Sequence, residues 1–162
     1  MLGLITGTNL CSALRKADGY ISHSPNFLCY SLGPELYWIR EGKLVMPDSW
    51  AERIGKSGYR YENVDEIVKT IHDRGIVLVK QPDDYQSQYK RCFYYRIRED
   101  MQLDFDWIDT LSRKFQVRML FTKCNPAAGD PSDSYDVEFI PCCCGKDEAV
   151  SLFGCQCRHY SH

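Results

Sequence analysis

The chain has 162 residues, of which 44% are hydrophobic and 26% are charged, and its net charge is −2. This length suits one domain with a core of its own, and the composition excludes a disordered chain. A charge so close to neutral gives no bulk electrostatic reason to expect a nucleic-acid or membrane partner. No apolar run approaches the about 20 residues of a membrane span, and the first residues lack the basic segment of a signal peptide. We therefore expect an intracellular, cytoplasmic protein whose thiols stay reduced.

The first half of the chain, residues 1–80, contains the clearest helix signal. Asn63 is a typical N-cap residue, apolar residues follow it with helical spacing, and Gly75 is a typical helix stop. Two β-rich runs around the Glu41-Gly42 turn predict a hairpin. The predicted elements are a helix at 8–17, the hairpin at 36–46, helices at 48–55 and 64–74, and a short buried strand at 76–79.

The second half, residues 85–141, predicts strands around one helix. Phe105, Ile108 and Leu111 follow helical spacing, whereas the strand segments alternate apolar and polar residues. The predicted elements are a strand at 89–98, a helix at 105–115, and strands at 116–123 and 135–141. This order could form a ferredoxin-like half.

Residues 146–153 fit either one or two helical turns or the return strand of a hairpin. Taken together, the pattern predicts a single α+β domain over residues 1–162, with mostly antiparallel strands and two or three helices. Its parts would be an N-terminal half over 1–80, a second half over 85–141 and a Cys/His-rich segment over 142–162.

This C-terminal segment concentrates the residue types that bind metals. Cys142 and Cys144 are two residues apart, as are Cys155 and Cys157, so in extended backbone each pair points to one side. Thiolates, with an imidazole such as His159, supply the tetrahedral ligand set that Zn²⁺ prefers. We therefore predict a structural zinc site built from these five residues, although neither pair has Cys-x-x-Cys spacing.

Other interpretations of these cysteines stay open. They could be small buried hydrophobic residues and inert surface thiols, or they could form disulfides in an oxidising compartment. A thiol-dependent enzyme would use Cys155 or Cys157 as its nucleophile with His159 as the base. A nucleophile in the last residues of a chain would be poorly buried, so the segment favours a structural role.

A second candidate site is the basic and aromatic strand at 89–98. Basic residues that alternate with aromatic rings could hold phosphates and stack bases, as in sheet-type RNA binders. The candidate nucleic-acid-binding residues are Lys90, Arg91, Tyr94, Arg96 and Arg98. A solvated outer face with arginine stems lying on it explains the same pattern.

A partner-binding surface is the remaining prediction. Amphipathic aromatic rings in polar sequence contexts are typical interface anchors. The candidates are Trp50, Tyr59, Tyr61, Tyr85 and Tyr89. No phosphate-cradling glycine loop, Gly-x-Ser-x-Gly elbow or His-Glu-x-x-His helix is recognisable, so no catalytic residue is predicted. By elimination we predict an inhibitor- or adaptor-like protein that binds a macromolecule, most readily another protein, with nucleic acid as the alternative.

Overall fold

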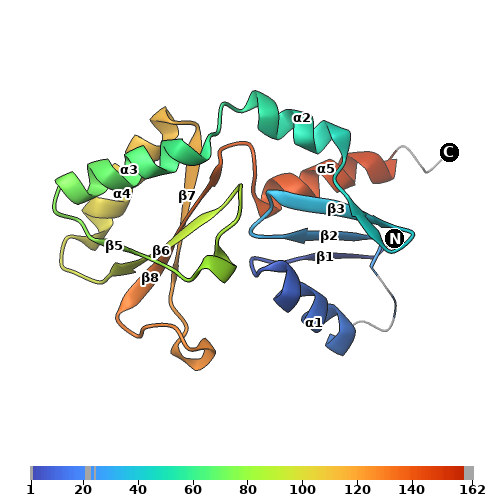
Figure 1. Cartoon of the computed structure of the whole chain (residues 1–162), viewed down its shortest axis with the longest axis horizontal. Helices are drawn as coiled ribbons and strands as arrows, with labels where there is room; N and C mark the ends of the chain where they lie inside the picture. The colour runs from blue at the N-terminus through green and yellow to red at the C-terminus, as the bar shows by residue number, and fades with distance from the viewer. Residues whose placement is uncertain (1, 21–22, 24, 159–162) are drawn as a thin grey trace. The chain divides into compact units, whose positions relative to one another are not determined.

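The structure is a computed structural model that describes residues 2–20, 23 and 25–158. The chain forms two compact units, which we call unit 1 (Met1–Lys56 with Cys143–His162) and unit 2 (Ser57–Cys142). Unit 2 is thus inserted between the two sequence segments of unit 1, and each unit has its own four-stranded sheet (Figure 1). The broad α+β class is confirmed, and the expectation of one domain stays a prediction.

Unit 1 is a sheet in the order β1-β2-β3-β4 with helices on it. Strand β1 is parallel to β2, whereas β2–β3 and β3–β4 are antiparallel, so the predicted hairpin at 36–46 is confirmed. A parallel pair needs a crossover connection, which α1 supplies. The elements are β1 (Gly3–Ile5), α1 (Leu10–Tyr20), β2 (Phe27–Tyr30), β3 (Glu35–Arg40), β4 (Lys43–Val45), α2 (Asp48–Lys56) and α5 (Lys146–Arg158).

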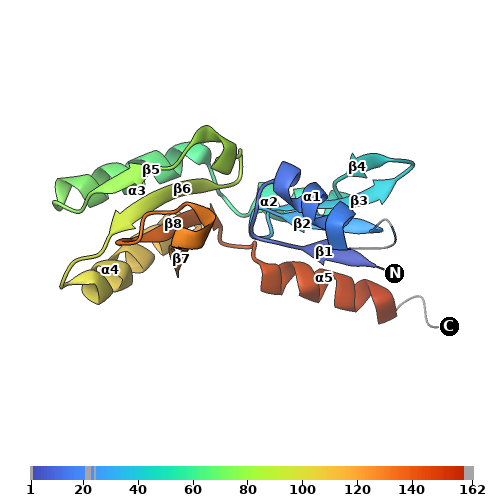
Figure 2. The ribbon, with the colours of Figure 1, turned by 90° about the horizontal axis from the view of Figure 1, so that it is seen from below.

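Alternation along β2 divides the residues of unit 1 between the two faces of its sheet. Leu28 and Tyr30 pack with Ala13 of α1 in a buried cluster on one face. Cys29 points to the opposite face, because successive side chains of a strand alternate. Cys144 and Ala149 are fully buried at the start of α5, which lies on the side of the sheet opposite α1 (Figure 2).

Unit 2 is an antiparallel sheet in the order β5-β6-β8-β7. Its elements are α3 (Tyr61–Asp73), β5 (Leu78–Lys80), the 3₁₀ turn η1 (Asp83–Tyr85), β6 (Arg91–Arg96), α4 (Met101–Lys114), β7 (Val117–Lys123), η2 (Pro126–Ala128) and β8 (Ser134–Pro141). Every predicted strand and helix of this region is present, with shifted ends.

The core of unit 2 lies between one face of its sheet and the helices α3 and α4. The sheet contributes alternate residues such as Phe93, Tyr95 and Val137, and α3 contributes Ile67 and Ile71. Each of these large apolar side chains stabilises the fold by about 1.5–3 kcal/mol when it is fully buried.

Two structural predictions need correction, and one open alternative is decided in favour of a helix. The run from 89 to 141 does not form a ferredoxin-like half, because β5 and α3 complete the same unit and β8 lies between β6 and β7. Asn63 is not the N-cap of its helix, which begins earlier with Arg60 as its N-cap. The ambiguous residues 146–153 belong to the helix α5.

Among the described residues, no helix is long and apolar enough to cross a membrane.

In unit 2, Asp104 of α4 is bonded to Tyr95 of β6 and forms an ion pair with Arg98, which follows that strand. Asp104 is 5% exposed and accepts hydrogen bonds from the Tyr95 hydroxyl at 2.5 Å and from Arg98 Nε and Nη2 at 2.6 Å each. Burial alone would raise the pKa of Asp104, but the hydrogen bonds from Arg98 and Tyr95 outweigh it and lower that pKa. The carboxylate is therefore held in its charged form.

Replacing this carboxylate should destabilise the chain. Asp104→Asn should lower the free energy of unfolding by about 1–3 kcal/mol. The substitution removes the negative charge that accepts hydrogen bonds from the Tyr95 hydroxyl and from Arg98. The matched control is Asp109→Asn on the same helix, which breaks a solvent-exposed i,i+4 pair with Arg113 and should cost less than about 0.5 kcal/mol. Urea denaturation at neutral pH measures both values.

The stabilising effect of Asp104 should depend on pH. Because its folded pKa is lowered, its stabilising effect is present above its unfolded pKa of about 3.9 and is lost as the pH falls through the folded value. The difference between the wild-type protein and Asp104→Asn should therefore narrow below about pH 4. A difference that stays constant or grows on acidification would contradict this interpretation.

Candidate functional site

The loop between β1 and α1 lies at the carboxyl ends of the two parallel strands of unit 1. The Thr6 amide donates to the Cys29 carbonyl at 2.8 Å, and the Ser31 amide donates to the Thr8 carbonyl at 3.0 Å. The loop that leaves β1 is thus tied to the turn that leaves β2. In open α/β sheets, ligands bind outside the carboxyl ends of the parallel strands, so this edge is the first place to look for a site.

The turn after β2 has an unusual backbone. Ser31, Leu32 and Gly33 all have positive φ angles, of 53°, 70° and 126°. Positive φ is costly for a bulky residue such as leucine and persists where the surrounding structure requires it, often at functional sites. A Cβ atom on Gly33 would lie 2.5 Å from the backbone carbon and oxygen of Gly145, so only glycine permits this close approach.

The close approach brings the first residue of α5 to the β1–α1 loop. Lys146 follows Gly145 directly, and its Nζ lies 3.6 Å from the position that a Cβ on Gly7 would occupy. Burial raises the pKa of the Cys29 thiol to about 12, and the charge of Lys146 acts against that rise. The Lys146 ammonium group therefore lies within electrostatic reach of the carboxyl end of β2.

These groups form a candidate anion site, which we call the Thr6–Thr8/Lys146 site. The Thr6 Oγ1 accepts from the Thr8 amide at 3.3 Å, so the proton of that hydroxyl is available to a ligand. Asn9 caps α1 by accepting from the Ser12 amide at 3.0 Å, and the N-terminus of α1 adds a positive dipole end to the same loop. Hydroxyl donors, a helix N-terminus and an ammonium group together suit a phosphate group.

The two predicted zinc residues whose side chains the structure describes, Cys142 and Cys144, do not share one environment. Cys142 is exposed and lies near Gln116 of unit 2, with Sγ 3.5 Å from Oε1. Cys144 is buried in unit 1, with its Sγ 3.8 Å from that of Cys143. Cys155 and Cys157 fall within α5. The side chains of these two cysteines, and His159, lie outside the described residues.

The basic strand is largely neutralised by neighbouring carboxylates. Each basic residue of the set forms an ion pair within unit 2: Lys90 with Glu138, Arg91 with Asp65, Arg96 with Asp133 and Arg98 with Asp104. Lys90 and Arg91 are 2% and 8% exposed, and the guanidinium group of Arg91 stacks on Tyr61 at 4.1 Å. Tyr94 is partly buried. These residues do not present the open cationic stripe that phosphate tracking requires.

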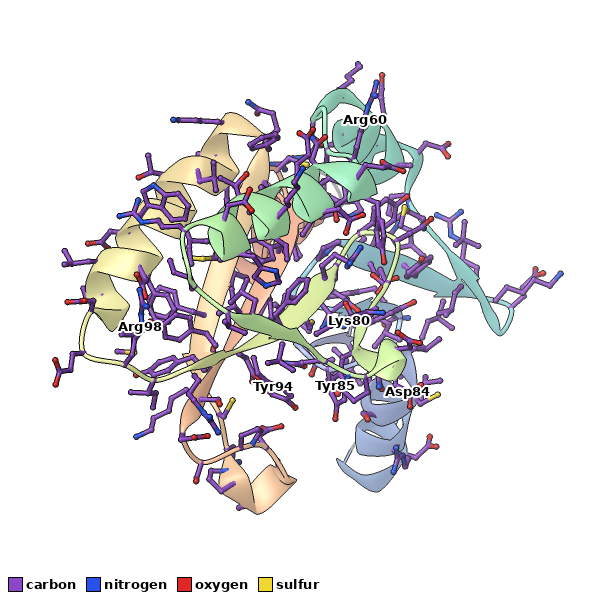
Figure 3. All side chains as sticks on the ribbon, turned by 60° about the vertical axis from the view of Figure 1, so that its left-hand side comes forward. Arg60, Lys80, Asp84, Tyr85, Tyr94 and Arg98 are labelled. Atoms are coloured by element: carbon purple, nitrogen blue, oxygen red, sulfur yellow. The ribbon has the colours of Figure 1, made fainter. Side chains whose placement is uncertain are left out.

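The predicted partner-binding residues do not share one environment. Trp50 is fully buried in unit 1 and donates its indole N–H to the Pro34 carbonyl at 2.8 Å, so it is a core residue. Tyr59 packs against the core of unit 2, and Tyr89 is partly buried. Tyr61 and Tyr85 are more than one-third exposed. Figure 3 shows Tyr85 with Asp84 at the η1 turn, whereas Arg98 lies beside α4.

Sequence reasoning missed the residues of the Thr6–Thr8/Lys146 site. The available signal was short: an apolar run that ends at Ile5, then Thr6-Gly7-Thr8, then a helix capped by Asn9. A strand, a glycine-containing loop and a helix in this order is the general pattern of phosphate-binding turns. Lys146 is far away in sequence and carried no local signal.

A family model describes nearly the whole chain. The model of sucrose-6F-phosphate phosphohydrolase matches residues 1–156. The chain belongs to this family. Kanosamine-6-phosphate phosphatase of Bacillus subtilis is 34% identical over 157 residues, a match that covers 94% of this chain and 55% of that relative. The chain thus spans about half the length of the curated relatives it matches.

Solved structures show the same fold. A haloacid dehalogenase-like hydrolase protein from Bacillus subtilis is 31% identical, with a TM-score of 0.65 over 93% of this chain and 54% of that one. The sucrose-phosphatase from Synechocystis sp. PCC6803, solved with sucrose and phosphate, is 16% identical, with a TM-score of 0.68 over 96% and 57%. The fold of this phosphohydrolase-family chain is therefore that of haloacid dehalogenase-like hydrolases, not a ferredoxin-like one.

Membership of this family overturns the functional predictions. The expected inhibitor- or adaptor-like binding role is wrong, and so are its nucleic-acid and thiol-enzyme alternatives, because the family is one of phosphohydrolases. The predicted protein or nucleic-acid partner is likewise wrong, since the family and the 34%-identical relative are named for small phosphorylated molecules.

The predicted zinc cofactor is also wrong. Phosphatases with this fold normally use Mg²⁺, which is bound mainly through carboxylate oxygens. Within residues 2–20, 23 and 25–158, no group of three or more His, Cys, Asp or Glu residues is placed to hold a metal ion. Asp104, Asp136 and Glu138 are instead bonded to neighbouring protein side chains. The described residues do not by themselves fit a magnesium site.

The Gly33–Gly145 approach predicts a measurable loss of stability. Gly33→Ala should lower the free energy of unfolding by more than about 2 kcal/mol, because positive φ and a backbone clash both oppose the added methyl group. Gly42→Ala is the matched control: φ is +74° there, but the added Cβ meets open space, so strain alone should cost about 1 kcal/mol. Equal losses in thermal or urea denaturation would show that the Gly145 backbone is not the constraint.

Proposed function

We propose that this chain functions in hydrolysis of a small-molecule phosphate monoester, with the Thr6–Thr8/Lys146 site holding the phosphate group. The observation that carries the proposal is the position of Lys146 Nζ against Gly7, in a loop at the carboxyl ends of parallel strands. The match to the phosphohydrolase family supports it independently.

A phosphorylated sugar is the substrate class that the relatives favour. Both the family description and the 34%-identical relative are named for sugar phosphates. The chain spans about half the length of that relative. Phosphate binding is therefore proposed on the residues of this chain, whereas hydrolysis is proposed on the family alone.

The residues of the site would bind and orient the phosphate group. The Lys146 ammonium group would offset the charge of the phosphate oxygens, and the hydroxyls of Thr6 and Thr8 would donate hydrogen bonds to them. The same donors would stabilise charge that develops on the phosphoryl oxygens during transfer, since catalysis of this reaction depends largely on positioning and electrostatics.

The proposal is tested by phosphate binding. Lys146→Ala should weaken the binding of inorganic phosphate at least about tenfold, because a charge-assisted hydrogen bond contributes about 1.5–3 kcal/mol. Lys43→Ala is the matched control, since Lys43 is an exposed lysine on β4 of the same unit. Isothermal titration calorimetry at low ionic strength measures both affinities.

The control separates a specific site from bulk charge. If Lys43→Ala lowers the phosphate affinity as much as Lys146→Ala does, the weaker binding comes only from the loss of one positive charge. The assignment of the phosphate to the Thr6–Thr8/Lys146 site would then be wrong. Unchanged binding in Lys146→Ala would reject the assignment of the phosphate to this loop.

A further inference from the structure

Two adjacent thiols lie one residue before Lys146 in the sequence. The Sγ atoms of Cys143 and Cys144 are 3.8 Å apart. Cys143 is partly exposed, whereas Cys144 is fully buried. The hydrogen bond with Cys143 and burial both raise the pKa of the Cys144 thiol. Of these two thiols, Cys143 is therefore the one that an oxidant in solution can reach, and Cys144 lies next to it.

The two thiols are connected to Lys146 through a short and constrained stretch of backbone. Gly145 alone separates Cys144 from Lys146, and its backbone is in tight contact with Gly33. The Gly145 carbonyl also accepts from the Ala149 amide at 3.0 Å, which forms the first turn of α5. A rotation of the backbone at Cys143 and Cys144 should therefore also move the first residues of α5.

We propose that Cys143 and Cys144 form a disulfide when the protein is exposed to a peroxide, and that this bond weakens phosphate binding by displacing Lys146. The second half of the proposal rests on the phosphate site proposed above.

Hydrogen peroxide can oxidise the two thiols to a disulfide in two steps. The Cys143 thiolate attacks one peroxide oxygen and breaks the O–O bond, which gives a sulfenic acid on Cys143 and hydroxide. The Cys144 sulfur then attacks the Cys143 sulfur and expels hydroxide, which leaves as water with the Cys144 proton. Two thiols are oxidised by two electrons, and the peroxide is reduced to two water molecules.

Formation of the disulfide would change the position of Lys146, because the two sulfur atoms must move closer together. A disulfide holds its sulfur atoms about 2.05 Å apart, so the present 3.8 Å separation must shrink by almost half. Cys143 would have to leave its contact with the Arg53 carbonyl on α2, which is 3.7 Å from its Sγ. The contact of Gly145 with Gly33 leaves no room on that side, so the start of α5 would have to move away from the loop.

Mass spectrometry tests the bond itself. Hydrogen peroxide treatment should lower the mass of the tryptic peptide 124–146 by about 2 Da, reversibly with dithiothreitol, with fragmentation suppressed between residues 143 and 144. Cys143→Ser should abolish this change. Cys142→Ser is the matched control, a neighbouring exposed cysteine in the same peptide, and should keep it. Loss of the change in Cys142→Ser, or its persistence in Cys143→Ser, would overturn the proposed pairing.

Phosphate calorimetry tests the consequence. The oxidised protein should bind inorganic phosphate at least about tenfold more weakly than the reduced protein, and peroxide should leave the affinity of Cys143→Ser unchanged. Equal affinity in both redox states would overturn the coupling to Lys146. If the reduced protein binds no phosphate, the proposed function fails, and with it the coupling, whereas the mass change still decides the disulfide.

Discussion

The close approach of Gly33 to Gly145 is the constraint on which the functional part of this structure depends. It joins the turn after β2 to the start of α5, which are distant in sequence, and no side chain fits between them. The positive φ angles at Ser31 and Leu32 are the local cost of this arrangement. Its result is that Lys146 lies against the β1–α1 loop, where a phosphate group can be held.

The two units divide structural and functional roles among their charged residues. In unit 2, the basic residues in β6 and directly beside it form ion pairs with carboxylates of the same unit. In unit 1, Lys146 is exposed at the start of a helix whose Glu148 pairs with Arg53 instead. An exposed ammonium group beside a helix N-terminus suits an anionic ligand, whereas an arginine that is already paired within the fold is less available to one.

Local sequence patterns predicted elements well and contacts poorly. The hairpin at 36–46 was predictable because Glu41 and Gly42 form a turn, and both have the positive φ angles that tight hairpins need. Asn63 has the chemistry of an N-cap, but inside the helix its amide donates to the Gly58 and Phe115 carbonyls.

The functional misses have a common physical cause. The zinc prediction rests on extended backbone at Cys155 and Cys157, whereas both residues fall within the helix α5. Lys146 and Gly7 meet only through the tertiary fold, which single-sequence patterns do not encode. The most direct test is a ¹H–¹⁵N NMR titration with inorganic phosphate. We predict the largest shifts at Thr6, Gly7, Thr8 and Lys146; shifts confined to unit 2, or none, would contradict the account.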